Sequence, residues 1–288
     1  MKIVTDSGTN VYLTEEQRRE LGIEIVPLSV TLNGKTYHEG LDVANDEFYG
    51  LLDASESLPT TSQPPAGEFA RLYREIAKTD NEILSIHMSS GLSGTLNAAK
   101  AGAAMVPEAK ITVIDTKTLG APAGWQVEAA AKAVKAGWPL KKVLAYVERI
   151  AAETDVVYTL KELKYLIHGG RISHIKGLVA SLLNIKPLIG VEKAGGTYVQ
   201  YGQAMSFERA IVNIGEYIAK KVNDGTQLRV QVVHAENADG ALKLVEELTN
   251  RFKCAWLPVE RLSLVLGAHV GRSMIGVAFA PEEIFELK

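Results

Sequence analysis

Hydroxyl groups and glycines are concentrated at residues 89–95, which read SSGLSGT and follow an apolar segment typical of a strand. A loop that leaves a strand and opens a helix presents backbone N–H groups and the positive end of the helix dipole, so it favours anions. The hydroxyls of Ser93 and Thr95 would add donors, and Gly94 between them permits a tight turn. A serine helix cap without any ligand fits the same pattern. An anion site and a plain helix start both remain open here.

Two enzymatic interpretations of this loop are incomplete. No lysine follows the glycines, so the nucleotide-binding pattern GxxxxGK[ST] is absent, although another phosphometabolite-binding enzyme stays a weaker alternative. The hydrolase pattern GxSxG begins at Gly91 and Ser93, but Thr95 stands in place of the last glycine. Because Ser93, Asp115 and His269 follow the chain order of the α/β-hydrolase triad, a serine hydrolase acting on lipids or esters through Ser93 and His269 remains the alternative function.

Three further segments carry polar side chains in unusual surroundings. Thr61 and Ser62 lie in TTSQPP at residues 60–65, where the prolines favour an extended loop with few backbone donors. His269 lies between glycines in GAHVG at residues 267–271, and Arg171 follows two glycines in GGRIS at residues 169–173. A guanidinium at that position can pair with carboxylates or anions at a domain junction. A solvated linker, a structural histidine and a surface arginine are the corresponding non-functional interpretations.

Composition narrows the class of protein. The net charge of −3 provides no basic field for nucleic acid, and the histidines and the single Cys254 show no metal-ligand spacing. We therefore expect neither a metal nor a disulfide. No apolar run is long enough to span a bilayer, and the first residues read as a strand instead of a signal peptide. These features predict a cytoplasmic protein with at most transient membrane contact.

The chain divides into two halves with different patterns. In the first half, strand signals alternate with helix signals. The strand signals lie at residues 2–4, 23–32, 35–37, 82–87 and 111–114, and the helix signals at 14–21, 45–52, 67–77 and 139–154. Residues 54–65 are expected to form a loop. This rhythm predicts a Rossmann-like α/β domain at residues 1–154, with a parallel sheet covered by helices on both faces. Ligands on such sheets bind beyond the carboxyl ends of the strands, here residues 6–8, 89–95 and 115–120.

The second half predicts a smaller α+β domain at residues 155–274 with a mixed or antiparallel sheet. Its strand signals lie at residues 186–192, 197–201, 229–234, 256–259 and 275–279, and its helix signals at 161–168, 206–222 and 238–252. Residues 172–183 form a further apolar segment. The last residues, about 275–288, are expected to be able to return to the first domain.

Taken together, these segments resemble the DegV family, which includes the FakB proteins of bacterial fatty acid kinase systems. The resemblance runs nearly end to end. It rests on IVTDS at 3–7, TSQP at 61–64, SGLSGT at 90–95, LIHGGRIS at 166–173, NIKP at 184–187 and GAHVG at 267–271.

The resemblance implies a long-chain fatty acid, palmitate or a similar one, held in a tunnel between the two domains, and no catalysis by the chain itself. It places the carboxylate against Thr61 and Ser93 with His269 nearby; Ser62, Gly94 and Arg171 complete the expected site. It also implies a FakA-type kinase as a partner that phosphorylates the bound carboxyl group. We expect selectivity for the tail in apolar tunnel residues, such as those at 178–183.

Two departures from the family pattern bear on the partner. Arg272 and Ser273 stand where Pro-Gly often follows the glycine after the histidine. QAMSFE at residues 203–208 replaces a usual basic stretch, so Met205 and Glu208 lie where positive charge is common. If that stretch docks the kinase, kinase coupling is weakened while lipid binding is not.

Overall fold

The first half of the chain forms a four-stranded parallel sheet. The computed structural model describes residues 1–172, 175 and 185–287. The strands follow the order β2-β1-β6-β7, with β1 at Lys2–Asp6, β2 at Ile23–Val26, β6 at Glu82–His87 and β7 at Lys110–Asp115. Neighbouring residues Ile3 and Val4, which point to opposite faces, are both fully buried. The predicted parallel sheet, buried on both faces, is confirmed.

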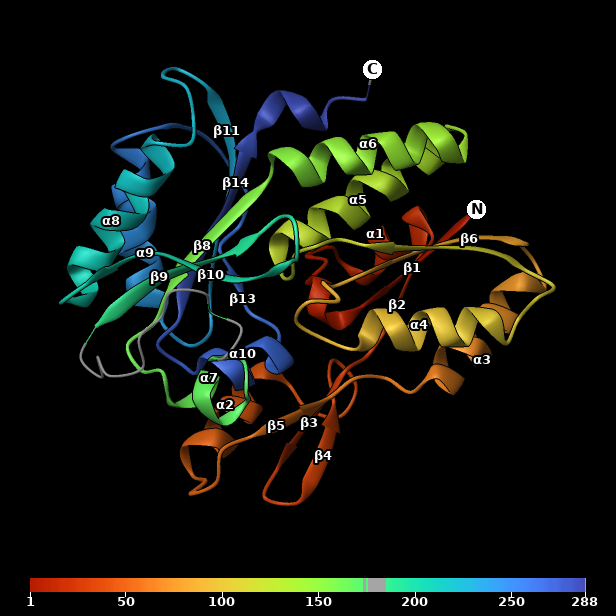
Figure 1. Ribbon diagram of the computed structural model, residues 1–288, viewed down its shortest axis with the longest axis horizontal. Coiled ribbons are helices and arrows are strands. Elements are labelled where there is room, and N and C mark those ends of the chain that lie inside the picture. Colours follow the sequence, from red (N-terminus) through yellow and green to blue (C-terminus); the bar gives the residue numbers. More distant parts are fainter. Residues whose placement is uncertain (173–174, 176–184, 288) are drawn as a thin grey trace.

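Helices cover both faces of this sheet (Figure 1). α3 (Ala66–Ala77) and α4 (Thr95–Ala104) pack on one face, and α1 (Glu15–Leu21) and α5 (Ala121–Lys135) on the other, with α6 (Leu140–Glu153) outside α5. The capping box that predicted α1 is present, because Thr14 and Gln17 each accept a hydrogen bond from the other's backbone N–H.

A small antiparallel sheet corrects two sequence expectations. It contains β3 (Ser29–Leu32), β4 (Lys35–His38) and β5 (Thr60–Ser62), and α2 (Asn45–Asp53) lies between the last two strands in sequence. The single strand expected over residues 23–32 is divided into β2 and β3, because Pro27 has no N–H to donate to a ladder. The loop expected through residue 65 contains β5, whose Thr61 pairs with Val30.

The second half forms a seven-stranded mixed sheet, as predicted. Its order is β10-β9-β8-β14-β11-β12, and β13 also pairs with β11. The strands are β8 (Asp155–Thr159), β9 (Lys186–Glu192), β10 (Thr197–Ala204), β11 (Gln227–His234), β12 (Lys253–Trp256), β13 (Glu260–Arg261) and β14 (Ile275–Pro281). α8 (Phe207–Ala219) and α9 (Ala238–Thr249) cover one face around a core of their own.

Several boundaries in this half differ from the expectation. The strand expected at 256–259 ends at Trp256, and the helix expected at 161–168 is only α7 (Lys164–His168). His269 lies on a short helix, α10 (Leu264–Val270), that the sequence did not predict. The expected return of residues 275–288 to the first domain is wrong for β14, which lies between β8 and β11. The final turn, η3 (Glu282–Phe285), does pack on α6. Tyr146 and Arg149 of α6 donate hydrogen bonds to backbone carbonyl oxygens of this turn.

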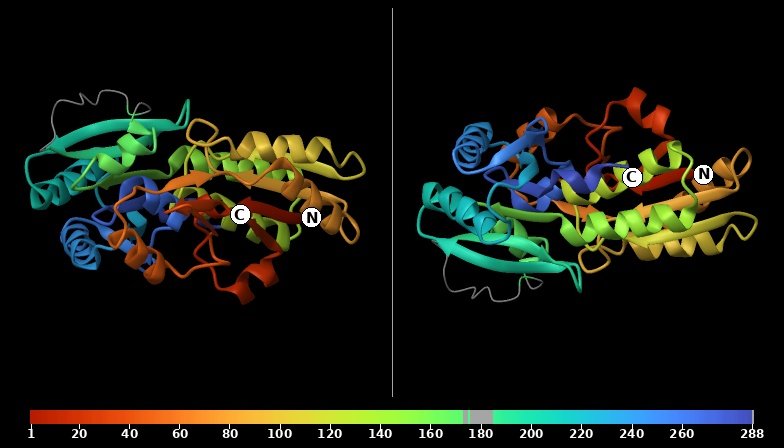
Figure 2. Two further views of the ribbon diagram at one scale, coloured as in Figure 1. Left: turned by 90° about the horizontal axis from the view of Figure 1, so that it is seen from below. Right: turned by 90° about the horizontal axis from the view of Figure 1, so that it is seen from above.

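The second face of the seven-stranded sheet packs against the first half of the chain. The Trp125 indole N–H of α5 donates to the Gln231 side chain of β11 at 3.1 Å, and Arg229 pairs with Glu128. At the β9–β10 turn, the buried Ser89 hydroxyl donates to the Gly196 carbonyl oxygen at 2.8 Å. The two sheets lie side by side along the molecule (Figure 2). We propose the domain division at 154/155, where α6 passes into β8.

A buried polar chain fixes the carboxyl ends of β1 and β6. The hydroxyls of Tyr73 and Ser85 are 2.7 Å apart, Ser85 lies 2.7 Å from His87 Nε2, and His87 Nδ1 lies 2.9 Å from Asp6. The Asp6 carboxylate also accepts from the Gly8 and Met88 backbone N–H groups. The side chains of all four residues in this hydrogen-bonded series are fully buried. Because each of these hydrogen bonds is shielded from water, the series holds the start of the 89–95 loop in place.

Replacing Ser85 should therefore destabilise the fold. Ser85→Ala leaves the Tyr73 hydroxyl and His87 Nε2 without this partner, and we expect a loss of about 2–4 kcal/mol in the free energy of unfolding, measured by urea denaturation. The control is Ser55→Ala, which removes a hydroxyl bonded only at the exposed surface and should change stability by less than about 0.5 kcal/mol. Equal stabilities of the two variants would show that the hydrogen-bonded series from Tyr73 to Asp6 does not support the 89–95 loop.

Candidate functional site

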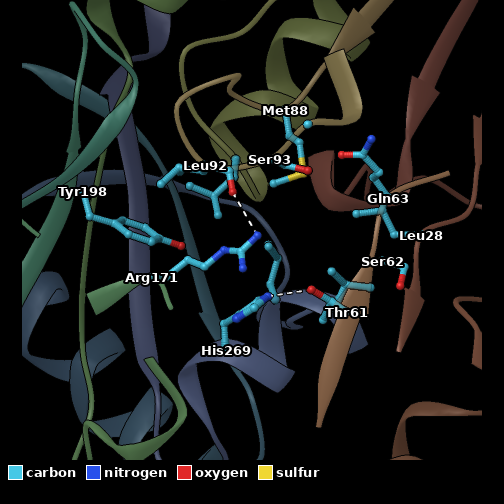
Figure 3. Close-up of a pocket in the computed structure, with 14 residues that line it drawn as sticks. Leu28, Thr61, Ser62, Gln63, Met88, Leu92, Ser93, Arg171, Tyr198 and His269 are labelled. Carbon is cyan, nitrogen blue, oxygen red and sulfur yellow. Dashed lines mark hydrogen bonds between the residues drawn. The ribbon is translucent and has the colours of Figure 1, made fainter. Parts of the chain in front are cut away.

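A cavity of about 320 Å³ lies where the first sheet, the small sheet and α10 meet. Its lining comprises Leu28, Thr61, Ser62, Gln63, Met88, Leu92, Ser93, Gly94, Leu119, Arg171, Tyr198, Val265, Leu266 and His269. All six expected site residues, which are far apart in sequence, are therefore on its wall. Figure 3 shows the side chains of Thr61, Ser93, Arg171 and His269 around one space.

Thr61 and His269 form the central polar contact of the cavity. The Thr61 hydroxyl lies 2.8 Å from His269 Nε2 (Figure 3), which links β5 to α10. His269 is only 8% exposed, and its Nδ1 is buried without a hydrogen-bond partner among the described residues. A Cβ on Gly169 would overlap this ring, so the glycine before Gly170 is required for the close approach of α7 to His269.

His269 is neutral at physiological pH. Burial, with the added repulsion of Arg171 and His168, lowers the pKa of the imidazole to about 4. A neutral ring carries one N–H, and an unbonded N–H costs more in a buried site than an unbonded lone pair. We therefore assign the proton to Nε2, which donates to the Thr61 hydroxyl oxygen. This leaves the Thr61 O–H free to donate to an acceptor in the cavity.

Ser93 and Gly94 contribute the second polar wall at the start of α4. The Ser93 hydroxyl oxygen accepts from the Thr95 N–H at 3.2 Å and lies 2.8 Å from the Thr95 hydroxyl. A Cβ on Gly94 would overlap the amide of Gln63, so a side chain at position 94 would require the Gln63 side chain to move. The positive end of the helix dipole of α4 lies directly beside the cavity, which favours a negative ligand atom there.

Among the described residues, Arg171 is the only cation on the wall of this cavity. Its guanidinium donates to the Gly169 carbonyl oxygen at 2.6 Å and, more weakly, to the Leu92 carbonyl oxygen at 3.5 Å. In Figure 3 the side chain extends between Leu92 and His269, toward the centre of the site, with the Tyr198 ring on its far side. Both contacts are to neutral carbonyls, and within the described part of the chain no carboxylate pairs with the guanidinium.

Ser62 is brought to the site but does not join its hydrogen bonds. It follows Thr61 in β5, where successive side chains point in opposite directions. Figure 3 shows its hydroxyl away from Arg171 and His269, and Ser62 is exposed. Sequence reasoning missed Gln63 and Tyr198, which also line the cavity. Gln63 was visible in the TTSQPP segment, whereas nothing in the pattern around Tyr198 distinguishes it from other strand tyrosines.

A narrow apolar cavity adjoins the polar one. It measures about 40 Å³ and shares Leu119, Tyr198 and Leu266 with the first cavity. It lies between the seven-stranded sheet, the start of α5 and α10, and the rest of its lining is Gly120, Ala121, Pro122, Val156, Tyr158, Val191, Val233, Leu262, Val270, Met274 and Ala278. The two cavities together provide a polar end and an almost wholly apolar continuation. The tunnel residues expected at 178–183 lie outside the described residues.

The described residues do not show the geometry that the hydrolase alternative requires. His269 bonds to Thr61, whereas Asp115 accepts from the Ser90 backbone N–H and hydroxyl and pairs with Lys117. Ser93 bonds to Thr95. Among the described residues, the serine, histidine and aspartate therefore form no hydrogen-bonded series, which nucleophilic catalysis by a triad requires.

The described residues contain no cluster of three or more His, Cys, Asp or Glu side chains that could hold a metal ion. Within the same part of the chain, no helix is long and apolar enough to cross a membrane.

Comparison with known proteins gives consistent matches over the full length. Residues 1–282 match the family model described as uncharacterised protein, DegV family COG1307. A DegV domain-containing protein of Halalkalibacterium halodurans is 32% identical over 282 residues, which cover 98% of each chain.

Solved structures show the same fold. A DegV family protein from Thermus thermophilus, described as binding fatty acid, superposes with a TM-score of 0.87 at 29% identity, covering 97% of this chain and 99% of that one. DegV from Bacillus subtilis, described as a fatty acid binding protein, gives a TM-score of 0.86 at 28% identity, covering 98% and 99%. With the model match and the full-length relatives, these structures confirm the resemblance seen in the motifs: the chain belongs to the DegV family.

Proposed function

We propose that this protein binds one long-chain fatty acid between its two sheets and presents the carboxyl group without transforming it. The carboxylate occupies the polar cavity at Thr61, Ser93 and Arg171, and the tail occupies the adjoining apolar cavity. The observation that carries this proposal is that the polar cavity and the apolar cavity adjoin, with Leu119, Tyr198 and Leu266 in the lining of both. The descriptions of the Thermus thermophilus and Bacillus subtilis relatives as fatty-acid binders support it.

The polar end meets the requirements of a buried carboxylate. An ionised group taken out of water needs several hydrogen bonds, preferably with charge assistance. The Thr61 and Ser93 hydroxyls and the Arg171 guanidinium offer such donors, and the α4 dipole adds a favourable potential. His269, being neutral, acts through Thr61: its N–H occupies the threonine oxygen and directs the threonine O–H toward the ligand.

The apolar end supplies most of the affinity. Burying an acyl chain releases about 0.8 kcal/mol per CH₂, so a 16-carbon tail provides roughly 12 kcal/mol before the costs of ordering and association. The apolar cavity is narrow in this structure, so a bound tail must separate the side chains that line it. Flexible residues such as Met274 and Leu266 can move in this way at low cost.

We propose that the bound head group is passed to another protein and is not transformed by this chain. A site of hydroxyls and one guanidinium can hold a carboxylate or an acyl phosphate, and the triad that hydrolysis requires is not assembled. We propose a FakA-type fatty acid kinase as the partner. Arg171 lies on the cavity wall, whereas Arg272 contacts Asp53 and is not part of the lining, so only Arg171 can compensate at the site for the missing basic stretch.

Removing either hydroxyl should weaken binding. We expect delipidated protein to bind oleate at one per chain in isothermal titration, and Thr61→Val and Ser93→Ala each to raise the Kd by about 10- to 100-fold, because bonds to a charged group contribute about 1.5–3 kcal/mol. Ser62→Ala is the matched control on the same strand and should change the Kd less than about threefold. Unchanged affinity in Thr61→Val and Ser93→Ala would place the head group elsewhere.

The neutral state of His269 predicts a specific pH dependence of stability. The folded-state pKa of about 4 lies below the ordinary value, so the unfolded chain binds more protons between about pH 6.5 and 4. The stabilisation is therefore complete above pH 6.5 and is lost as the pH falls toward 4, by about 2–4 kcal/mol in total. Gln at position 269 keeps an N–H for Thr61 but does not titrate.

The measurement compares lipid-free wild type and His269→Gln by urea unfolding at pH 7 and 4.5. The wild type should lose more stability than the variant. The pKa of His234 is also lowered by burial, and burial raises the pKa of Glu39 to about 7, but both groups are present in both proteins and cancel in the difference. A difference that does not change with pH would show that His269 is not held neutral.

The rate at which a fatty acid kinase phosphorylates the bound fatty acid should increase when positive charge is added in the segment that follows β10. Met205 is 76% exposed and precedes α8, where the family commonly carries positive charge. We expect the oleate-loaded protein to form acyl phosphate slowly with a purified fatty acid kinase, and Met205→Arg to increase the rate in a salt-sensitive way. Leu242→Arg, at an exposed apolar position of α9, is the control for added charge alone. Fast turnover in the wild type with no gain in Met205→Arg would contradict this docking role.

A further inference from the structure

Tyr198 lies at the boundary between the polar cavity and the apolar cavity. Three described residues line both spaces, Leu119, Tyr198 and Leu266, and Tyr198 alone among them carries a polar group. It belongs to β10 of the seven-stranded sheet and is only 4% exposed. Because the proposed carboxylate lies on one side of this boundary and the tail on the other, the Tyr198 phenol meets the first carbons of a bound chain.

The Tyr198 hydroxyl points toward a group that cannot accept its proton. Figure 3 shows the phenol oxygen directed into the site at the Arg171 side chain, and the charge of Arg171 acts on this phenol. A guanidinium carries donors and no acceptor. Burial raises the pKa of Tyr198 to about 12, against the opposing effect of Arg171, so the phenol stays protonated at neutral pH. The hydroxyl is therefore a donor that faces the ligand space and finds no acceptor in Arg171.

Tyr158 adds a second phenol beside the first. It lines the apolar cavity, and its ring lies edge-on to the Tyr198 ring, with the ring centroids 6.0 Å apart. Its hydroxyl is buried without a hydrogen-bond partner among the described residues. The other described residues in the lining of the apolar cavity are glycine or have apolar side chains. The two tyrosines thus carry the polar groups of a space that is otherwise apolar, next to its boundary with the polar cavity.

An unsubstituted acyl chain leaves the Tyr198 hydroxyl unsatisfied. Methylene groups that pass the phenol displace water from it and offer no acceptor, and a buried donor without a partner weakens binding. An oxygen atom on the chain close to the carboxyl group restores the lost hydrogen bond. Arg171 can share this oxygen, because its guanidinium has more N–H donors than its two carbonyl contacts use.

We propose, building on the fatty-acid-binding function, that the site prefers long-chain acids that carry a hydroxyl group near the carboxylate, and that Tyr198 recognises this hydroxyl. The carboxylate stays with the Thr61 and Ser93 hydroxyls. The added hydroxyl accepts a hydrogen bond from Tyr198 and lies beside Arg171. A site built in this way discriminates well, because the ligand that lacks the oxygen leaves a buried protein donor unpaired.

The experiment is isothermal titration of the delipidated full-length protein with four acids of equal chain length. These are palmitate, the two enantiomers of 3-hydroxypalmitate measured separately, and 16-hydroxypalmitate, an isomer that carries its hydroxyl at the far end. We expect one 3-hydroxy enantiomer to bind about tenfold more tightly than palmitate. The 16-hydroxy acid should bind more weakly than palmitate, because its hydroxyl enters the apolar end of the site.

Tyr198→Phe removes the hydroxyl and keeps the ring, so the ratio of the palmitate Kd to the 3-hydroxypalmitate Kd should fall below about twofold in this variant. Tyr217→Phe is the matched control, because it removes a tyrosine hydroxyl from α8, which lines neither cavity, and it should keep the wild-type ratio. Equal binding of palmitate and both 3-hydroxy enantiomers by the wild type, or a preference that survives in Tyr198→Phe, would overturn the proposal while fatty acid binding stands. Failure of all four acids to bind would instead overturn the fatty-acid-binding function, and this preference with it.

Discussion

Burying a carboxylate is costly unless several hydrogen-bond donors are already positioned to bind it. The arrangement of donors in the polar cavity meets this constraint. The donors come from β5, from the start of α4 and from the segment after α7, which are distant in sequence. The Thr61–His269 bond joins two of these elements. Because His269 is buried and neutral, its N–H has one strong role, which is to orient the Thr61 hydroxyl. A protonated histidine would instead compete for the ligand and would require its own buried counter-ion.

The fold brings these hydrogen-bond donors together in part because loops that follow parallel strands meet at one edge of the sheet. Ligand-binding loops of a parallel sheet gather at the carboxyl edge, and the Asp6–His87–Ser85–Tyr73 chain fixes that edge from below. The seven-stranded sheet then closes the site from the side, with Ser89 bonded to the β9–β10 turn. In the proposed complex, the head group contacts Thr61 and Ser93 of the first half together with Arg171 of the second half. The apolar cavity proposed for the tail lies between the seven-stranded sheet, the start of α5 and α10.

The sequence predicted those parts of the structure that depend on local signals. Alternating strand and helix patterns predicted the parallel sheet, and the Thr14 capping box marked the start of α1 correctly. Thr61, Ser93, Arg171 and His269, which line one cavity, could be predicted as candidates because each lies in a segment of unusual composition, and the family resemblance predicted a shared role for them. Features set by long-range contacts were missed. The strand at Thr61 forms only against Val30, helix α10 is too short for a periodic pattern, and β14 reaches the middle of its sheet only after the neighbouring strands are placed.

Binding of a fatty acid head group in the polar cavity is tested most directly by a crystal structure of the delipidated protein reloaded with oleate. The carboxylate is expected within hydrogen-bond distance of the Thr61 and Ser93 hydroxyls, with Arg171 turned toward it. The tail should then pass Tyr198 and separate the apolar side chains between the seven-stranded sheet and α10. A carboxylate bound outside the polar cavity, or a tail that does not enter the apolar cavity, would show that the proposed site is wrong.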